Sequence, residues 1–120
     1  MRHWNLGEVE TPNGTRSPVV LYSQDGEARV VLIRIDPGQA LGEHQVKENA
    51  WVTVVDGSVR IAAGDQTIEA GPGTVVRFDP DERRSVTSHR GAGVLLFLAP
   101  WPGEGHYRGG RGVRAGVSAS

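Results

Sequence analysis

Short apolar runs separated by turn residues dominate this chain. Each run has the length of a strand and is rich in Val, Ile, Leu or Thr: PVVLYS, ARVVLIRI, WVTVVDG, SVRIAAG, QTIEAG, TVVRF and GVLLFLAP. None is long enough to make a good helix. The 17 glycines and 7 prolines between them supply tight turns, without the period of collagen. The chain is therefore predicted to be all-β and antiparallel, as a sandwich or a barrel.

Two turns predict local hairpins. The runs 51–55 and 58–63 flank an Asp-Gly pair, which is typical of two-residue hairpin turns. A Gly-Asp pair just before residues 66–70 predicts a second hairpin. Both predictions rest on neighbouring residues alone.

Two of the runs are apolar on both faces of the strand they predict. In residues 28–35 and 94–98, apolar side chains occupy both sets of alternate positions. Such strands lie inside a sandwich or at a subunit interface, and one small barrel has little room to hide them, so we expect a homodimer. Trp51 faces away from its apolar neighbours, and is expected either on the outer surface or, after a one-residue slip, in the cavity.

Composition excludes several classes of function. Thirteen Lys and Arg balance 14 Asp and Glu without charged blocks, so no nucleic-acid partner is expected. There is no cysteine for disulfides, thiolate catalysis or a cysteine-ligated zinc. No segment approaches the roughly 18 apolar residues of a membrane span, and the first residues lack the apolar core of a signal peptide. We expect a cytoplasmic protein without a membrane partner.

The two ends of the chain lack the strand-length apolar runs of the middle. The predicted organisation is an N-terminal arm at 1–17, a barrel at 18–100, an aromatic extension at 101–108 and a flexible tail at 109–120. The extension holds Trp101, His106 and Tyr107. Large rings need a surface to pack on, so the extension is expected to fold back over the barrel or against a second subunit.

Two stretches of the sequence resemble the conserved motifs of the cupin family. The residues similar to the first motif are Pro37-Gly38, His44 and 51–57, and those similar to the second are 71–78, Pro80 and Ser85-Val86. The resemblance covers about residues 18–98 and implies a jelly-roll barrel, the double-stranded β-helix. Proteins of this family include dioxygenases, isomerases, decarboxylases, sugar-nucleotide epimerases and non-catalytic ligand-binding or sensor domains. Fold alone does not choose among them.

The resemblance also implies where a metal would bind. Cupins supply two histidines and a glutamate from the first motif and a histidine from the second. Those places fall on His44, Val46, Ala50 and Arg84, so three of the four ligands are substituted. Because one histidine does not hold a first-row metal, no cofactor is expected.

A rearranged metal site is the alternative. His44 and Glu48 can hold a divalent transition metal if the loop after them curls back and a third ligand joins them. The candidates for that third ligand are Glu43, His89 and His106.

Strand alternation and the family's register predict the side chains inside the barrel. They place His44 on one strand opposite Arg84 on another, and a histidine facing an arginine is a plausible anion site. The predicted ligand-binding residues are His44, Val46, Val52, Phe78, Arg84 and Ser88. The alternative is structural: Arg84 turns outward or pairs with Glu48 or Glu82, and His44 is a hydrogen-bonded core residue.

Two functional hypotheses follow, and the substituted metal ligands favour the first. In the first, the protein binds a small anionic or partly apolar molecule in its barrel without a standard metal site. In the second it is an enzyme of dioxygenase, isomerase or lyase type, working either through a metal with rearranged ligands or by acid/base catalysis at His44 beside Arg84.

Overall fold

The computed structural model describes residues 1–10, 18–44 and 46–103, and at 42–44 the backbone alone. This part of the chain contains one 3-10 turn, η1, and nine strands. Their bounds are η1 Leu6–Glu8, β1 Val19–Gln24, β2 Ala28–Ile35, β3 Ala40–His44, β4 Asn49–Gly57, β5 Val59–Ala63, β6 Gln66–Ala70, β7 Val75–Phe78, β8 Arg84–Thr87 and β9 Ala92–Ala99. No helix among these residues has the length and apolar character needed to cross a membrane.

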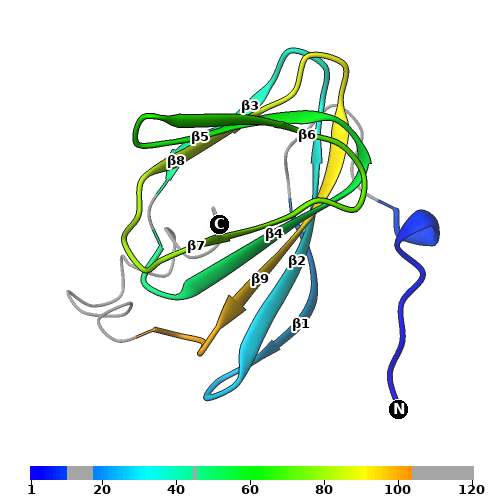
Figure 1. Cartoon of the computed structure of the whole chain (residues 1–120). Helices are drawn as coiled ribbons and strands as arrows, with labels where there is room; N and C mark the ends of the chain where they lie inside the picture. Colours follow the sequence, from blue (N-terminus) through cyan, green and yellow to red (C-terminus); the bar gives the residue numbers. More distant parts are fainter. Residues whose placement is uncertain (11–17, 45, 104–120) are drawn as a thin grey trace.

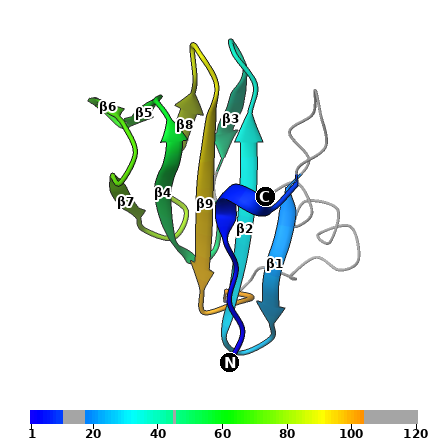
Figure 2. The same cartoon turned by 90° about the vertical axis from the view of Figure 1, so that its right-hand side faces the viewer.

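The strands form two antiparallel sheets that face each other as the walls of a barrel (Figure 1). The larger sheet has the order β1-β2-β9-β4-β7, and the smaller one the order β3-β8-β5-β6. Figure 2 shows β1, β2, β9 and β4 side by side in the larger sheet. The hydrophobic core lies between the two sheets. The predicted all-β jelly-roll barrel is therefore confirmed.

Every second apolar residue of β2 and β9 belongs to the hydrophobic core, as the alternation in the sequence predicts. In β2, Val31, Ile33 and Ile35 are at most 3% exposed, because every second side chain of a strand points to the same face. In β9 the same face is formed by Val94, Leu96 and Leu98, also at most 3% exposed. The intervening residues of both strands lie on the outer face of the larger sheet, the face turned away from this core.

One predicted hairpin is confirmed and the other is wrong. β5 and β6 pair through the turn at Gly64, as predicted. β4 and β5, however, lie in different sheets. β4 pairs with β9 as far as Gly57, whose φ of +74° turns the chain into the smaller sheet. A Cβ on Gly57 would lie 2.2 Å from the carbonyl oxygen of Gly91, so this crossing requires glycine.

The chain folds back onto the barrel directly after β9. Trp101 is 2% exposed and belongs to the hydrophobic core. Its backbone is fixed to the β1–β2 turn, because its N–H donates to the carbonyl of Glu27 (3.2 Å) and its carbonyl accepts from Gly26 (2.7 Å). The guanidinium carbon of Arg29 lies 4.9 Å from the centre of the Trp101 ring system. The other two aromatic positions of the predicted extension, His106 and Tyr107, lie outside the described residues.

Candidate functional site

Arg84 begins β8 and lies inside the barrel wall. The register between β3 and β8 sets its backbone directly opposite that of His44, so the two positions share a face of the sheet. The Arg84 side chain is 6% exposed, and its guanidinium carbon lies 5.1 Å from the centre of the Phe78 ring. Phe78 itself is 2% exposed. The side chain of His44 lies outside the described part of the structure.

The charge of Arg84 has little compensation. Within the described ranges, its buried Nη1 has no hydrogen-bond partner, and no carboxylate forms an ion pair with the side chain. Burial lowers the pKa of Arg84, and the negative charge of Glu82 opposes this only in part. The Glu48 and Glu82 pairings considered from the sequence are therefore not formed. An anion beside a buried cation that lacks a counter-charge would stabilise that cation.

Phe78, Val46 and Val52 are packed as core residues. Val46 is 7% exposed and Val52 is 2% exposed, and both belong to the hydrophobic core. These side chains can supply an apolar wall to a ligand but no hydrogen bond. Their predicted role in ligand binding remains a prediction.

Ser88 directly follows β8, at the opposite end of the strand from Arg84. The two residues are four positions apart, which is about 13 Å along an extended chain. The Ser88 hydroxyl donates to the carbonyl of Ser58 (2.7 Å) and accepts from the N–H of Gly91 (2.9 Å). Ser88 thus ties together the loops at this end of the barrel, and its predicted role in ligand binding remains a prediction.

The turn before β8 fixes where this strand begins, and so the position of Arg84. Asp81 takes a φ of +65°, a left-handed conformation that aspartate tolerates better than most residues. Its N–H donates to the carbonyl of Val46 (2.7 Å), and its carboxylate pairs with Lys47 at 2.9 Å. This turn is therefore docked on the loop that follows β3, which brings the second motif against the first.

The side chains proposed for a rearranged metal site are not gathered in the part of the chain that is described. Glu48 is fully buried, and its Oε2 accepts a hydrogen bond from the N–H of Gly103 (2.7 Å). His89 is exposed and lines a groove on the outer side of the smaller sheet. No group of three or more His, Asp or Glu residues suited to a metal occurs in residues 1–10, 18–41 and 46–103. The side chains of Glu43 and His106 lie outside the described residues.

The donor chemistry at the substituted motif positions does not fit the family's metal. The resemblance puts Val46, Ala50 and Arg84 where ligands would stand. Valine and alanine have no lone pair to offer, and the guanidinium of arginine is a cation without an acceptor. A buried positive charge beside a metal ion also repels it. No chemical step is derived through a metal.

A small cleft opens beside Phe78. It has a volume of about 100 Å³, and its lining residues are Ile61, Ala63, Gln66, Ile68, Val76, Arg77, Phe78 and Glu82. The apolar members of this set come from strands of both sheets, and the polar ones are exposed. Since drug-sized ligands occupy roughly 300–1,000 Å³, this cleft suits a molecule of only a few heavy atoms.

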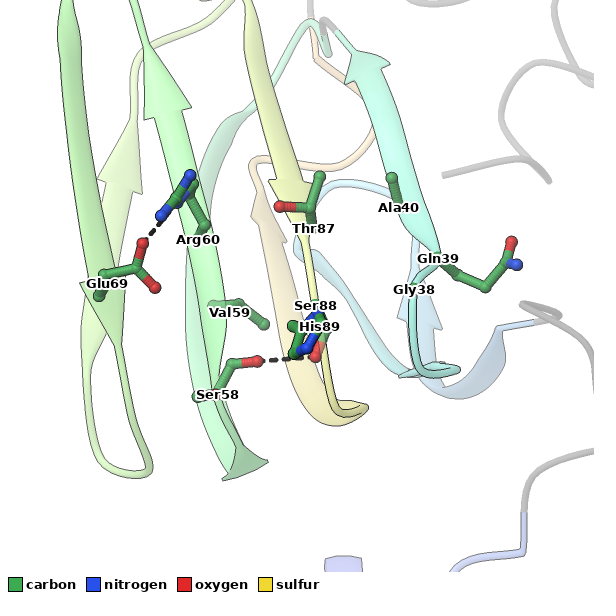
Figure 3. A pocket seen from close by; sticks show the side chains of 10 residues that line it. All are labelled: Gly38, Gln39, Ala40, Ser58, Val59, Arg60, Glu69, Thr87, Ser88 and His89. Atoms are coloured by element: carbon green, nitrogen blue, oxygen red, sulfur yellow. Dashed lines mark hydrogen bonds and ion pairs between the residues drawn. The ribbon is translucent and has the colours of Figure 1, made fainter.

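A second concavity lies on the outer side of the smaller sheet (Figure 3). The sequence did not predict it, although the predicted ligand-binding residue Ser88 and the candidate metal ligand His89 both line it. Its volume is about 410 Å³. The strand registers align Ala40, Thr87, Arg60 and Glu69 across it, and Figure 3 shows Arg60 and Glu69 meeting as an ion pair at one side. These residues come from four strands, so no local pattern in the sequence signals the groove.

Comparison with known proteins agrees with this architecture. The family profile described as Cupin domain matches residues 31–99, which is more than half of the chain. No curated protein matches it.

Solved structures with the same fold are numerous. An RmlC-like cupin protein from Desulfovibrio desulfuricans is 24% identical, with a TM-score of 0.70 over 83% of this chain and 97% of that one. A protein from Klebsiella pneumoniae, described as uncharacterized and conserved with a double-stranded β-helix domain, is 20% identical, with a TM-score of 0.69 over 87% and 92%. A cupin superfamily protein from Desulfitobacterium hafniense is 16% identical, with a TM-score of 0.68 over 75% and 82%. At these identities the likeness concerns the fold alone. With the family match over β2 to β9, it establishes that this chain belongs to the cupin family.

Proposed function

We propose that this protein binds a small anion inside its barrel, at Arg84, without using the family's metal site. The observation that carries the proposal is the buried Nη1 of Arg84, which has no hydrogen-bond partner among the described residues. Removing a charge from water is costly unless another group compensates it. An anion would supply that compensation, and the planar guanidinium matches the geometry of a carboxylate or a phosphate.

The surroundings of Arg84 favour a small and partly apolar anion. Phe78 presents its ring to the guanidinium and also lines the cleft of about 100 Å³, most of whose lining residues are apolar. Glu82 and Arg77 line that cleft with opposite charges, so its small volume, rather than its charge, excludes a large and highly charged anion. A short carboxylate such as acetate or butyrate therefore fits better than a polyphosphate.

The test compares the stability of the wild type with that of Arg84→Met, with and without anions. Methionine replaces the cation by an apolar chain of similar length, so without an anion the variant is expected to be at least as stable as the wild type. Added acetate, butyrate or inorganic phosphate should raise the melting temperature of the wild type alone. At 100 times Kd, binding stabilises a protein by about 2.7 kcal/mol.

Arg60→Met is the matched control. Arg60 is also an arginine in a strand, but it is exposed and paired with Glu69, so the anion response should survive its replacement. A loss of about 3–5 kcal/mol in Arg84→Met without anions would contradict the proposal, because that is the cost of breaking a buried ion pair within the protein. An equal anion response in the wild type and in Arg84→Met would contradict it as well.

A further inference from the structure

The groove on the outer side of the smaller sheet plays no part in the function proposed above. The strand registers bring Ala40, Thr87, Arg60 and Glu69 into one row beneath it. The side chains of Ala40 and Thr87 are short, whereas the arginine and the glutamate are long and rise at one side (Figure 3). The volume of the groove, about 410 Å³, lies within the range of roughly 300–1,000 Å³ that is typical of small-molecule sites.

The lining of this groove is rich in hydrogen-bonding groups. Arg60 and Glu69 form an ion pair, so one positive and one negative charge balance each other. Both side chains are 65% exposed. The remaining polar side chains offer an amide, hydroxyls and an imidazole, and they belong to Gln39, Ser58, Thr87, Ser88 and His89.

Most of these groups still have bonds to offer. Nε of Arg60 donates to Oε2 of Glu69, and neither side chain makes another hydrogen bond among the described residues. The terminal nitrogens of the guanidinium and Oε1 of the carboxylate are thus open to a ligand. The side chains of Gln39 and Thr87 also make no hydrogen bond within the described ranges. Donors and acceptors therefore meet around one hollow.

We propose that this groove binds a neutral molecule with several hydroxyl groups, of the size of a monosaccharide. Arg60 and Glu69 are direct cross-strand neighbours, so they present donors and an acceptor side by side. Two adjacent hydroxyls match this pattern, because one accepts from the guanidinium while the other donates to the carboxylate, and the ion pair stays intact. The Thr87 hydroxyl, in the middle of the row, is placed for a third contact (Figure 3).

The lining fits other classes of molecule less well. An anion drawn to Arg60 meets the like charge of Glu69, and a cation drawn to Glu69 meets Arg60. An apolar molecule would take water from the polar groups and give no hydrogen bond in return. A zwitterionic amino acid matches both charges but has to separate the ion pair, and it therefore serves as the rival ligand in the test.

The exposure of the lining sets the expected affinity. Gln39, Ser58, Arg60, Glu69 and His89 are all exposed, so water competes for each hydrogen bond that a ligand makes. We therefore expect a dissociation constant between about 1 and 50 mM. The groove and the buried Arg84 lie on opposite sides of the smaller sheet, so binding here is independent of the anion site.

Two-dimensional NMR of the isotope-labelled full chain tests the proposal. The probes are glucose, galactose, mannose and ribose, each added to about 200 mM, which exceeds the expected dissociation constant. Cyclohexanol, a ring of similar size with one hydroxyl, and alanine, a zwitterion, are the comparison ligands. At least one sugar should shift the amide signals of residues 38–40, 58–60 and 87–89 in a saturable way, and the two comparison ligands should not.

Three variants test the contacts, and the spectrum of each shows whether it is folded. Glu69→Met removes the acceptor and should weaken sugar binding at least tenfold. Thr87→Val removes a hydroxyl with little change of shape and should weaken it about threefold or more. Ser85→Ala is the matched control, because Ser85 lies two residues earlier on the same face of β8 but does not line the groove. Its sugar binding should equal that of the wild type.

Four results would overturn the proposal. They are the absence of a shift with every sugar, shifts that lie away from the groove, a response to alanine or cyclohexanol as strong as that to the sugars, and an equal effect of the Thr87 and Ser85 variants.

Discussion

Replacing Trp101 by alanine should remove a piece of the core that lies beyond the last strand. Trp101 is 2% exposed, so nearly all of its side-chain area is buried. A buried tryptophan removes about 150–250 Å² from water, which at about 25 cal/mol per Å² is worth about 4–6 kcal/mol as an upper bound. Tryptophan-to-alanine changes in cores cost about 3–5 kcal/mol. The expected loss for Trp101→Ala is therefore about 3–5 kcal/mol.

Urea denaturation, followed by circular dichroism, measures this loss. With a slope of about 2 kcal/mol per molar, the midpoint should fall by about 2 M. Trp101→Phe keeps an aromatic ring beside Arg29 and should lose less than half as much. Trp4→Ala is the control, because Trp4 is 44% exposed and its replacement should change stability by no more than about 0.5 kcal/mol. A loss below about 1 kcal/mol for Trp101→Ala would refute the placement of Trp101 in the core.

Two other substitutions test particular contacts. Gly57→Ala should destabilise the fold far more than Gly64→Ala, although both glycines have a positive φ. A Cβ at position 57 would lie 2.2 Å from the carbonyl oxygen of Gly91, whereas a Cβ at position 64 would meet no atom within 4 Å. Equal losses in urea denaturation would contradict this. The hydrogen bond from Arg34 lowers the pKa of Asp56, so the pair's contribution is present above the unfolded-state pKa of about 3.9 and is lost as pH falls through the lower folded pKa. Asp56→Asn should remove that part of the acid dependence of stability, and an unchanged profile between pH 5 and 2 would argue against it.

The fold was largely predictable because its signals are local. Alternation in β2 and β9 identifies the core face, and the Gly64 turn identifies the β5–β6 hairpin. The chain's crossing at Gly57 was not predictable in this way. An Asp-Gly pair favours a hairpin, but here pairing of β4 with β9, some 40 residues away, takes precedence over the local preference. Which strands pair is decided by core packing across the whole barrel.

The candidate site was predictable only in part. Strand alternation and the family's register place Arg84 inside the barrel, and the side chain is buried there. Whether a carboxylate accompanies it depends on long-range packing: Glu48, one of the two carboxylates considered, accepts a hydrogen bond from Gly103 instead. Ser88 follows the same alternation, but loop contacts with Ser58 and Gly91 engage its hydroxyl. The spacing of the motifs predicts neither the hydrogen bond that Glu48 makes nor those of the Ser88 hydroxyl.

A crystal structure determined with acetate, beside one of Arg84→Met grown in the same way, tests anion binding at Arg84 most directly. We expect the acetate carboxylate within hydrogen-bond distance of Nη1 of Arg84, with its methyl group near Phe78, and no acetate there in Arg84→Met. A protein carboxylate paired with Arg84, with acetate absent from the barrel, would contradict the proposal.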